Sequence, residues 1–156
     1  MGLDMYLKRR TYCLPTEEMK TNGELTIIGS NTEIKAKAAK LSRIVIEEDV
    51  AYWRKANQIH NWFDRQTESG VANCQEYSFS FDTLIELRDI CKQVLADREI
   101  AEELLPTCDG FFFGESDYDE YYFEDLQETV QIIDELEKHE MNCNDRAPQY
   151  SYCAWW

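Results

Sequence analysis

The chain lacks the motifs that mark common metal, cofactor and membrane-spanning sites. Its six cysteines form no C-x-x-C pair, and their spacing from the two histidines matches no zinc pattern. No apolar run approaches the roughly 20 residues that cross a bilayer. No repeat or linker divides the sequence. We therefore expect reduced thiols, no metal, no cofactor, no membrane partner and a single domain over residues 1–156.

Basic residues are also scarce. Sixteen Lys and Arg stand against 31 Asp and Glu, which gives a formal net charge of −15. Affinity for a nucleic-acid backbone comes from cations that neutralise phosphates, so we expect no direct binding to free nucleic acid. Two interpretations of the acidity remain open. It keeps the protein soluble, or its carboxylates imitate phosphates and occupy a basic groove on another protein.

The first residues carry no targeting pattern. Asp4 interrupts the short apolar stretch at the start, unlike a signal or transit peptide. Together with the thiols, this indicates a cytoplasmic protein.

Hydrophobic patterning predicts an α+β fold. Leu3, Met5 and Leu7 alternate with polar residues, which is typical of a half-buried strand, and residues 150–156 alternate well enough for a last strand. The predicted order is strands, helix, strand, two helices and strand. We expect one antiparallel sheet packed on one face by about three helices, with the first strand inside the sheet.

Apolar residues at helical spacing predict three main helices. The first runs from Val50 to about Arg65 with Asp49 as its cap, because Tyr52, Ala56, Ile59 and Phe63 are four, three and four residues apart. The second follows Ser80 as N-cap and buries Leu84, Leu87, Cys91, Val94 and Leu95. The third buries Phe123, Leu126, Val130, Ile133 and Leu136. Residues 33–40 fit either a short helix or an edge strand.

A polar strip accompanies the first predicted helix. Trp53, Asn57, His60 and Asp64 are four, three and four residues apart, so they share one side of that helix. His60 fits a general base oriented by Asp64, a ligand-binding donor, or a boundary histidine whose hydrogen bonds are satisfied. No nucleophile is tied to it by sequence, so no catalytic residue is assigned and the pattern favours a binding protein over an enzyme.

Three consecutive aromatics lie between two glycines, Gly110 and Gly114. Phe111, Phe112 and Phe113 cannot all face one core, so at least one must point elsewhere. A ring stacked on a ligand and a short inner strand are both open interpretations. No Lys-Ser or Lys-Thr follows, which excludes a phosphate-binding loop.

Acidic and tyrosine residues alternate just beyond this run. Glu115, Asp117, Asp119 and Glu120 surround Tyr118, Tyr121 and Tyr122. A calcium loop starting at Asp117 would need glycine at its sixth position, which is Tyr122, so we expect no metal there. The structural interpretation is that these acids lie in the first turn of a helix, where they interact favourably with its positive end.

Arg54 and Lys55 are rare cations in an acidic chain. An anionic ligand would need them, although an exposed helix face is the favoured interpretation.

Several segments together resemble a family of small uncharacterised proteins encoded by bacteriophages and prophages. The resemblance rests on the start Met1–Leu7, on residues 52–63 (YWRKANQIHNWF), on Gly110–Gly114 and on residues 118–122 (YDEYY). It does not cover residues 16–40. The resemblance implies a phage or prophage source, and therefore action in the host-cell cytoplasm. It implies no mechanism. Small accessory phage proteins often counter host defences, and that step is analogy.

The leading hypothesis is a binding protein that blunts host immunity by sequestering a small anionic, nucleotide-derived signal. The alternatives are an acidic mimic of nucleic acid that inhibits a host defence protein, of anti-CRISPR or anti-restriction type, and a small hydrolase of nucleotides or nucleic acid. A pocket binder should place the Phe run and the Trp53 strip around one cavity. The predicted ligand-binding residues are Trp53, Arg54, Lys55, Asn57, His60, Phe111, Phe112, Phe113, Tyr118 and Tyr121.

Overall fold

The computed structural model describes residues 2–13, 24–28, 33–37, 44–68, 70–71, 74–142 and 148–156. The elements in chain order are β1 (Asp4–Cys13), β2 (Glu24–Ile28), β3 (Glu33–Lys37), β4 (Ile44–Arg54), α2 (Asn57–Arg65), β5 (Tyr77–Phe79), α3 (Phe81–Ala96), the 3₁₀ turn η1 (Arg98–Ile100), α4 (Ala101–Leu104), α5 (Glu120–Asn142) and β6 (Gln149–Trp155). The fold is α+β, and its elements follow the predicted order, with the short η1 and α4 added between the two predicted helices α3 and α5.

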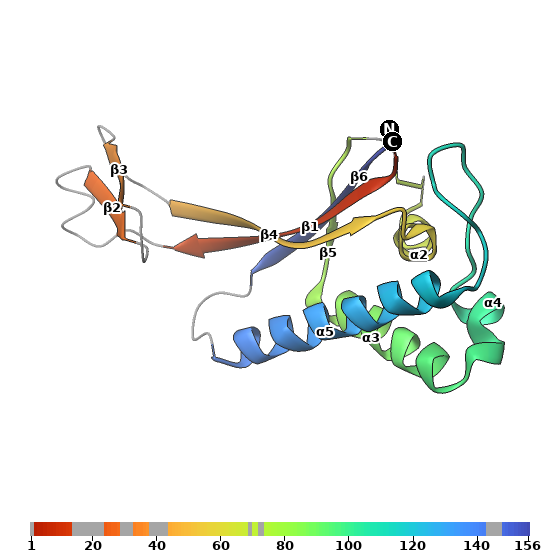
Figure 1. The fold of residues 1–156 in the computed structure, drawn as a ribbon. Helices are drawn as coiled ribbons and strands as arrows, with labels where there is room; N and C mark the ends of the chain where they lie inside the picture. Colours follow the sequence, from red (N-terminus) through yellow and green to blue (C-terminus); the bar gives the residue numbers. More distant parts are fainter. Residues whose placement is uncertain are drawn as a thin grey trace.

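A four-stranded antiparallel sheet with the order β4-β1-β6-β5 forms the centre of the fold (Figure 1). Met5 of β1 pairs with Trp53 of β4 on one side and with Ala154 of β6 on the other. Leu3, Met5 and Leu7 are fully buried, as their alternation predicts. The prediction that the first strand lies inside the sheet is confirmed.

The helix predicted over residues 50–65 is wrong in its first part. Residues 50–54 belong to β4, and Asp49, the predicted cap, also lies in that strand. Ala51 and Trp53 are buried while the residues that follow each of them are exposed, which is the alternation of a half-buried strand.

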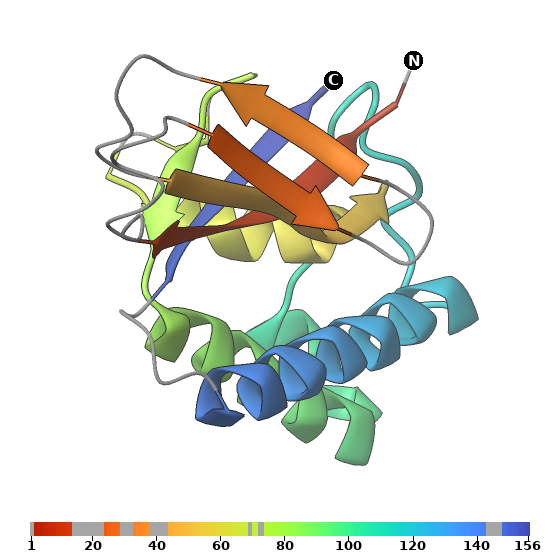
Figure 2. The same ribbon diagram turned by 90° about the vertical axis from the view of Figure 1, so that its left-hand side faces the viewer.

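The helices α3 and α5 run side by side beneath the sheet, as Figures 1 and 2 show from two directions. The Ser80 hydroxyl accepts a hydrogen bond from the amide of Thr83 at 3.2 Å, so the predicted N-cap is confirmed. The predicted apolar faces are buried, with Leu95 and Val130 partly so. The buried members are Leu84, Leu87, Cys91, Val94, Phe123, Leu126, Ile133 and Leu136.

The strands β2 and β3 pair with each other in a separate two-stranded antiparallel ladder, with Ile27 opposite Ile34. Figure 1 shows this ladder at one end of the molecule, away from the helices. The open choice for residues 33–40 is thereby decided in favour of a strand over Glu33–Lys37. The ladder adds to the single sheet that the sequence predicts.

Two global predictions concern membranes and thiols. Of the helices in the described part of the chain, none is both long enough and apolar enough to cross a bilayer. No disulfide is recorded between any two of the four cysteines whose side chains are described, namely Cys74, Cys91, Cys108 and Cys153. The side chains of Cys13 and Cys143 lie outside the described residues.

Candidate binding site

A sharp corner between β4 and α2 begins the candidate site. Lys55 stands at this corner with a φ of 63°, a left-handed conformation that non-glycine residues seldom adopt. Its amide donates to the carbonyl of Leu3 at 2.8 Å, and its carbonyl accepts from the amide of Asn57 at 2.8 Å. These bonds hold a conformation that costs about 1–3 kcal/mol. The corner places Arg54 and Gln58 at the same cleft.

Asn57, the first residue of α2, ties the loop of residues 107–119 to this corner. Its Nδ2 donates to the carbonyl oxygens of Phe113 at 3.3 Å and Glu115 at 2.8 Å. Its Oδ1 accepts from the amide of Cys108 at 3.2 Å. One buried amide thus satisfies three backbone groups of an irregular segment. The sequence predicts Asn57 as a ligand-binding residue, whereas its polar atoms are engaged within the protein.

Further contacts hold the same loop. The amide of Leu3 donates to the carbonyl of Phe112 at 2.9 Å, and the Thr107 hydroxyl donates to the carbonyl of Ser116 at 3.0 Å. Gly114 has a φ of 93°, and a Cβ added there would lie 3.1 Å from the Lys55 Cβ. A side chain at Gly114 would therefore be strained in its backbone and crowded by its neighbour. The loop keeps its acidic residues in fixed positions against the corner.

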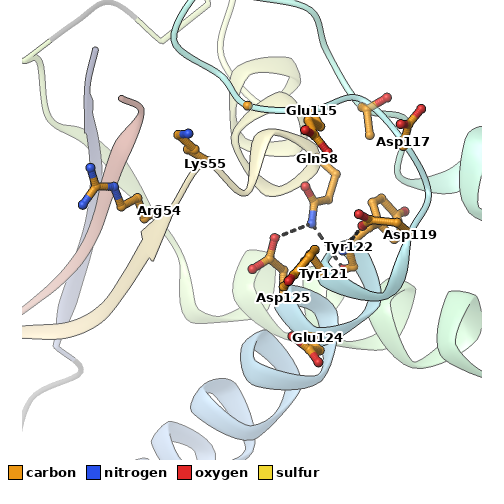
Figure 3. A pocket seen from close by; sticks show the side chains of 12 residues that line it. Arg54, Lys55, Gln58, Glu115, Asp117, Asp119, Tyr121, Tyr122, Glu124 and Asp125 are labelled. Atoms are coloured by element: carbon orange, nitrogen blue, oxygen red, sulfur yellow. Dashed lines mark hydrogen bonds between the residues drawn. The ribbon is translucent and has the colours of Figure 1, made fainter. Parts of the chain in front are cut away.

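The corner, the loop and the first turns of α5 enclose an open cleft of about 510 Å³, here named the acidic cleft (Figure 3). The corner forms one side, the loop forms the other, and α5 forms the bottom. The lining residues are Arg54, Lys55, Gln58, Thr107, Gly114, Glu115, Asp117, Asp119, Tyr121, Tyr122, Glu124 and Asp125.

Negative charge dominates the acidic cleft. Five lining side chains are carboxylates and two are cations. Figure 3 shows Arg54 and Lys55 directed away from the carboxylates, and the Arg54 Nε lies 3.9 Å from the Asp4 carboxylate. Burial raises the pKa of Asp125 to about 6, although Gln58 donates a hydrogen bond to it at 3.0 Å. The interior of the cleft therefore favours a cationic occupant.

The acids of the cleft are not neutralised within the fold. Glu115, Asp117 and Glu124 make no ion pair with any residue that the structure describes. Glu47 and Glu48 of β4 differ in this respect. Glu47 accepts from Arg10 at 2.6 Å, and the Arg10 guanidinium lowers the pKa of Glu47. The charges of Glu47 and Glu48 are thus paired within the fold, whereas the three unpaired carboxylates of the cleft are available to a partner.

A second hollow of about 250 Å³ lies beside α2 and is here named the His60 hollow. Side chains of α2, of the loop and of the residue after β6 form its walls. It shares no lining residue with the acidic cleft. Its lining residues are His60, Asn61, Asp64, Val71, Cys108, Phe113 and Trp156.

His60 is 4% exposed and surrounded by rings. Its Nδ1 lies 2.9 Å from the Tyr152 hydroxyl, and its ring meets Phe113 at 5.1 Å and Trp156 at 5.4 Å between centroids. Burial lowers the pKa of His60, and the charge of Asp64 acts in the opposite direction. The expected proximity of His60 to the Phe run is confirmed at Phe113. That these residues bind a ligand stays a prediction.

Cys108 shares the hollow with His60 but is not placed as a nucleophile. Its thiol donates to the carbonyl of Asn57 at 3.4 Å rather than to the imidazole. Burial raises the pKa of Cys108 to about 11, and the negative charge of Asp64 adds to the effect, so the thiol stays protonated. The hydroxyl bonded to His60 belongs to Tyr152, which is fully buried. The described part of the chain therefore offers no pair of nucleophile and base at His60.

Trp53 lies in the core rather than at a binding surface. It is 2% exposed, its ring tilts against Phe63, and its Nε1 donates to the Thr129 hydroxyl at 3.0 Å. The strip predicted to begin at Trp53 is interrupted, because Trp53 stands on β4 and the rest of the strip on α2. Trp53 therefore lines neither hollow, whereas His60 and Asp64 of the strip line the His60 hollow together with Phe113 of the Phe run.

The three phenylalanines of the loop have different environments. Phe111 is 96% exposed and meets Phe112 edge to face at 4.9 Å. Phe113 packs against the core and lines the His60 hollow. The prediction that three consecutive rings cannot share one core face is confirmed.

The remaining predicted residues lie at or near the acidic cleft. Arg54, Lys55 and Tyr121 come together as lining residues, and Tyr121 is 75% exposed. Tyr118 lies outside the lining, where its ring meets Tyr122 edge to face at 5.0 Å.

Sequence reasoning missed several residues that line the two hollows. Gln58 and Asp125 meet at 3.0 Å although they are 67 positions apart in the chain. Cys108 and Trp156 reach the His60 hollow from distant segments. Spacing along the chain identifies neighbours on one helix or strand and carries no signal for such distant pairs.

Comparisons of the chain with protein-family models, with curated proteins and with solved structures find no match. Two features of the described residues therefore bear on function: carboxylates without cationic partners in the acidic cleft, and a buried imidazole in the His60 hollow.

Proposed function

We propose that the protein acts by binding, and that its acidic cleft receives a basic side chain of a partner protein. The observation that carries this proposal is the set of five cleft carboxylates. Among them, Glu115, Asp117 and Glu124 have no ion pair with a described residue. Complementary charge steers association and fixes the orientation of the partner.

An arginine or lysine side chain fits this cleft by its chemistry. Carboxylates from the loop and from α5 accept its N–H donors, and each hydrogen bond to a charged group contributes about 1.5–3 kcal/mol. The exposed ring of Tyr121 adds a cation–π contact of about 0.5–1 kcal/mol. An inserted arginine beside a tyrosine is a combination that often dominates the energy of a protein interface.

The acidic surface continues from the cleft along α5. Glu120, Glu124 and Glu128 are exposed and four residues apart, so they lie on one face about 6 Å apart along the axis. Glu120 pairs with Arg98 at 2.7 Å, which leaves Glu124 and Glu128 to face a partner. A row of carboxylates is similar in charge to a phosphate backbone and therefore complements a groove that binds nucleic acid.

The resemblance to phage and prophage proteins gives this binding a context. In a host cytoplasm, an acidic protein that fills a basic groove blocks a defence protein that must bind nucleic acid. The proposed role is therefore an inhibitor of a host defence protein, of anti-CRISPR or anti-restriction type.

Sequestration of a nucleotide-derived signal has weaker support at the acidic cleft. A phosphate group needs cations, yet Arg54 and Lys55 stand against five carboxylates there. A hydrolase has weaker support too, because Cys108 is protonated and does not bond His60. A small-ligand role is better supported at the His60 hollow, where the lining holds a single carboxylate.

The test measures binding of a fluorescently labelled arginine-rich peptide by anisotropy, at low and at physiological salt. The site variant combines Glu115→Gln, Asp117→Asn and Glu124→Gln. A matched control removes three exposed acids elsewhere through Glu68→Gln, Asp82→Asn and Glu86→Gln, with the same change in net charge.

We expect saturable binding to the unaltered protein and to the control. The site variant should bind at least roughly tenfold more weakly, which corresponds to about 1.4 kcal/mol and to the loss of a single charged hydrogen bond. Equal weakening in both variants would mean that only net charge matters. That result, or non-saturable binding to the unaltered protein, would refute the proposed site.

A further inference from the structure

The hydrogen bond between His60 and Tyr152 determines where the imidazole carries its proton. The Tyr152 hydroxyl is fully buried, and its hydrogen-bond partner among the described residues is the His60 Nδ1. A buried hydroxyl that donated to nothing would lose a hydrogen bond, so Tyr152 donates and Nδ1 accepts. A neutral imidazole then carries its hydrogen on Nε2. Burial lowers the pKa of His60 and keeps the ring neutral.

The His60 Nε2 is a donor without a partner in the described part of the chain. The ring is 4% exposed, its recorded hydrogen bond goes through Nδ1, and its side chain lines the His60 hollow. Among the described residues no fully buried side-chain nitrogen or oxygen lacks a partner, so the unpaired Nε2 is accessible, and its N–H is available to a group that enters the hollow.

Asp64 supplies an acceptor beside this donor. It follows His60 by four residues on α2, so the two Cβ atoms lie about 5–6 Å apart on one face. Its Oδ1 accepts from the amide of Val71 at 2.6 Å. A Cβ added at Gly70, where φ is 73°, would lie 2.9 Å from that oxygen, so the turn closes tightly around the carboxylate. The position of Asp64 is thereby fixed, and Oδ2 remains to accept a hydrogen bond.

Aromatic rings provide the apolar walls of the same hollow. Phe113 and Trp156 meet at 5.7 Å between centroids with an interplanar angle of 85°, and each also contacts His60. A cavity of roughly 150 Å³ holds a benzene ring. A hollow of about 250 Å³ therefore has room for a larger flat ring. Apolar walls with a few fixed polar groups are typical of small-molecule sites.

We propose that the His60 hollow binds a neutral planar heterocycle that carries a hydrogen-bond acceptor next to an N–H donor, as the edge of a nucleobase does. The acceptor takes the hydrogen of the His60 Nε2, and the ring N–H donates to the Asp64 Oδ2. This site uses no residue of the acidic cleft, so it goes beyond the proposed function and does not depend on it.

The paired donor and acceptor make the site selective. A ring methylated at the donor nitrogen places a methyl group against the Asp64 carboxylate and leaves that carboxylate unpaired. Sites built to hydrogen-bond a ligand N–H discriminate strongly against analogues that lack it. Guanosine and uridine both carry a ring N–H beside a carbonyl, and each has a derivative methylated at that nitrogen.

The test titrates guanosine, uridine and the two methylated derivatives into the full chain. Binding is followed by quenching of tryptophan fluorescence and by saturation-transfer NMR of the nucleoside. The protein variant is Asp64→Asn, whose amide oxygen still accepts from Val71 but whose nitrogen opposes the ring N–H. The control is Glu68→Gln, an exposed carboxylate four residues further along.

We expect saturable binding of at least one nucleoside, with roughly tenfold or greater weakening by methylation and by Asp64→Asn. Glu68→Gln should leave the affinity unchanged. Equal binding of the methylated and unmethylated forms, or no saturable binding of either nucleoside, would overturn the proposal.

The methylated nucleosides probe the unaltered protein, so they decide the question even where Asp64→Asn impairs folding. The acidic-cleft variant should bind nucleosides normally, and Asp64→Asn should bind the arginine-rich peptide normally. A failure of this inference is thereby distinguished from a failure of the proposed function.

Discussion

Replacing Asn57 tests whether this residue holds the loop of residues 107–119 in place. Asn57→Ala removes hydrogen bonds to the backbone of Cys108, Phe113 and Glu115. At about 1 kcal/mol net for each bond, the loss is about 3 kcal/mol, and the space left by a side chain that is 1% exposed adds to it. In a chain of this length, that loss lowers the melting temperature by roughly 6–12 °C.

Asn61→Ala is the matched control, since Asn61 stands one helical turn further along α2. Its side chain makes one hydrogen bond, from Nδ2 to the carbonyl of Pro106 at 2.8 Å. The loss of about 1 kcal/mol is offset by a helix propensity of alanine that is up to about 0.7 kcal/mol better. We therefore expect a small change at Asn61 and a large one at Asn57.

Urea unfolding followed by tryptophan fluorescence measures both free energies, provided that the denaturant slope is unchanged between variants. Asn57→Asp provides a second variant, because a carboxylate accepts from the Cys108 amide but cannot donate to the two carbonyl groups. It should destabilise at least as much as alanine. Equal losses at Asn57 and Asn61, or a loss below about 1 kcal/mol at Asn57, would refute the anchoring role.

Three further predictions concern the sheet, one carboxylate and the thiols. Deleting residues 1–7 removes part of a strand that pairs on both sides, so circular dichroism should show an unfolded chain, and an unchanged melting temperature would contradict this. Burial raises the pKa of Asp125 to about 6 from a usual 3.8, so its stabilising contribution is present below pH 3.8 and is lost as pH rises through about 6. Asp125→Asn should therefore be more stable than the unaltered protein at pH 7, with the difference in unfolding free energy shrinking below pH 6 and vanishing only below pH 3.8, and a pH-independent difference would contradict this. All six cysteines should react with a thiol reagent after denaturation. In the native state exposed Cys74 should react well before buried Cys91, whose pKa burial raises to about 12, and simultaneous reaction would contradict the structure.

Much of the fold was predictable because burial of one face imposes a local pattern on the sequence. The alternation of Leu3, Met5 and Leu7 correctly predicts an inner strand. Ser80 correctly predicts the start of α3, because its hydroxyl caps the first turn. These features involve residues close together in the chain, where periodicity and capping act directly.

The corner between β4 and α2 was not predictable from spacing. Ala56, Ile59 and Phe63 are buried as a helical face requires, but the preceding residue of that pattern, Tyr52, is exposed on β4. The accidental four-residue interval from Tyr52 to Ala56 extends the helical pattern across a strand and a turn. Lys55 takes a positive φ that the sequence does not signal, because glycine is the residue expected there.

The candidate site was predictable in part. The scarcity of cations and the surplus of aromatic residues predict Arg54, Lys55 and Tyr121 as binding residues, and all three line the acidic cleft. Helical spacing assigns Trp53 to a ligand-binding strip with Asn57 and His60, whereas its indole N–H bonds Thr129 in the core. Whether a polar side chain faces a cleft or the interior depends on tertiary contacts between distant segments, which spacing alone does not encode.

Backbone amide NMR during titration with the arginine-rich peptide at physiological salt tests the central claim most directly, because it locates the contact surface residue by residue. The largest shifts should fall on Gln58, Thr107, residues 114–117 and residues 121–125, which line the acidic cleft or adjoin its lining. Small shifts there, with the largest on α3 or on the paired acids of β4, would contradict the claim that this cleft binds a basic partner.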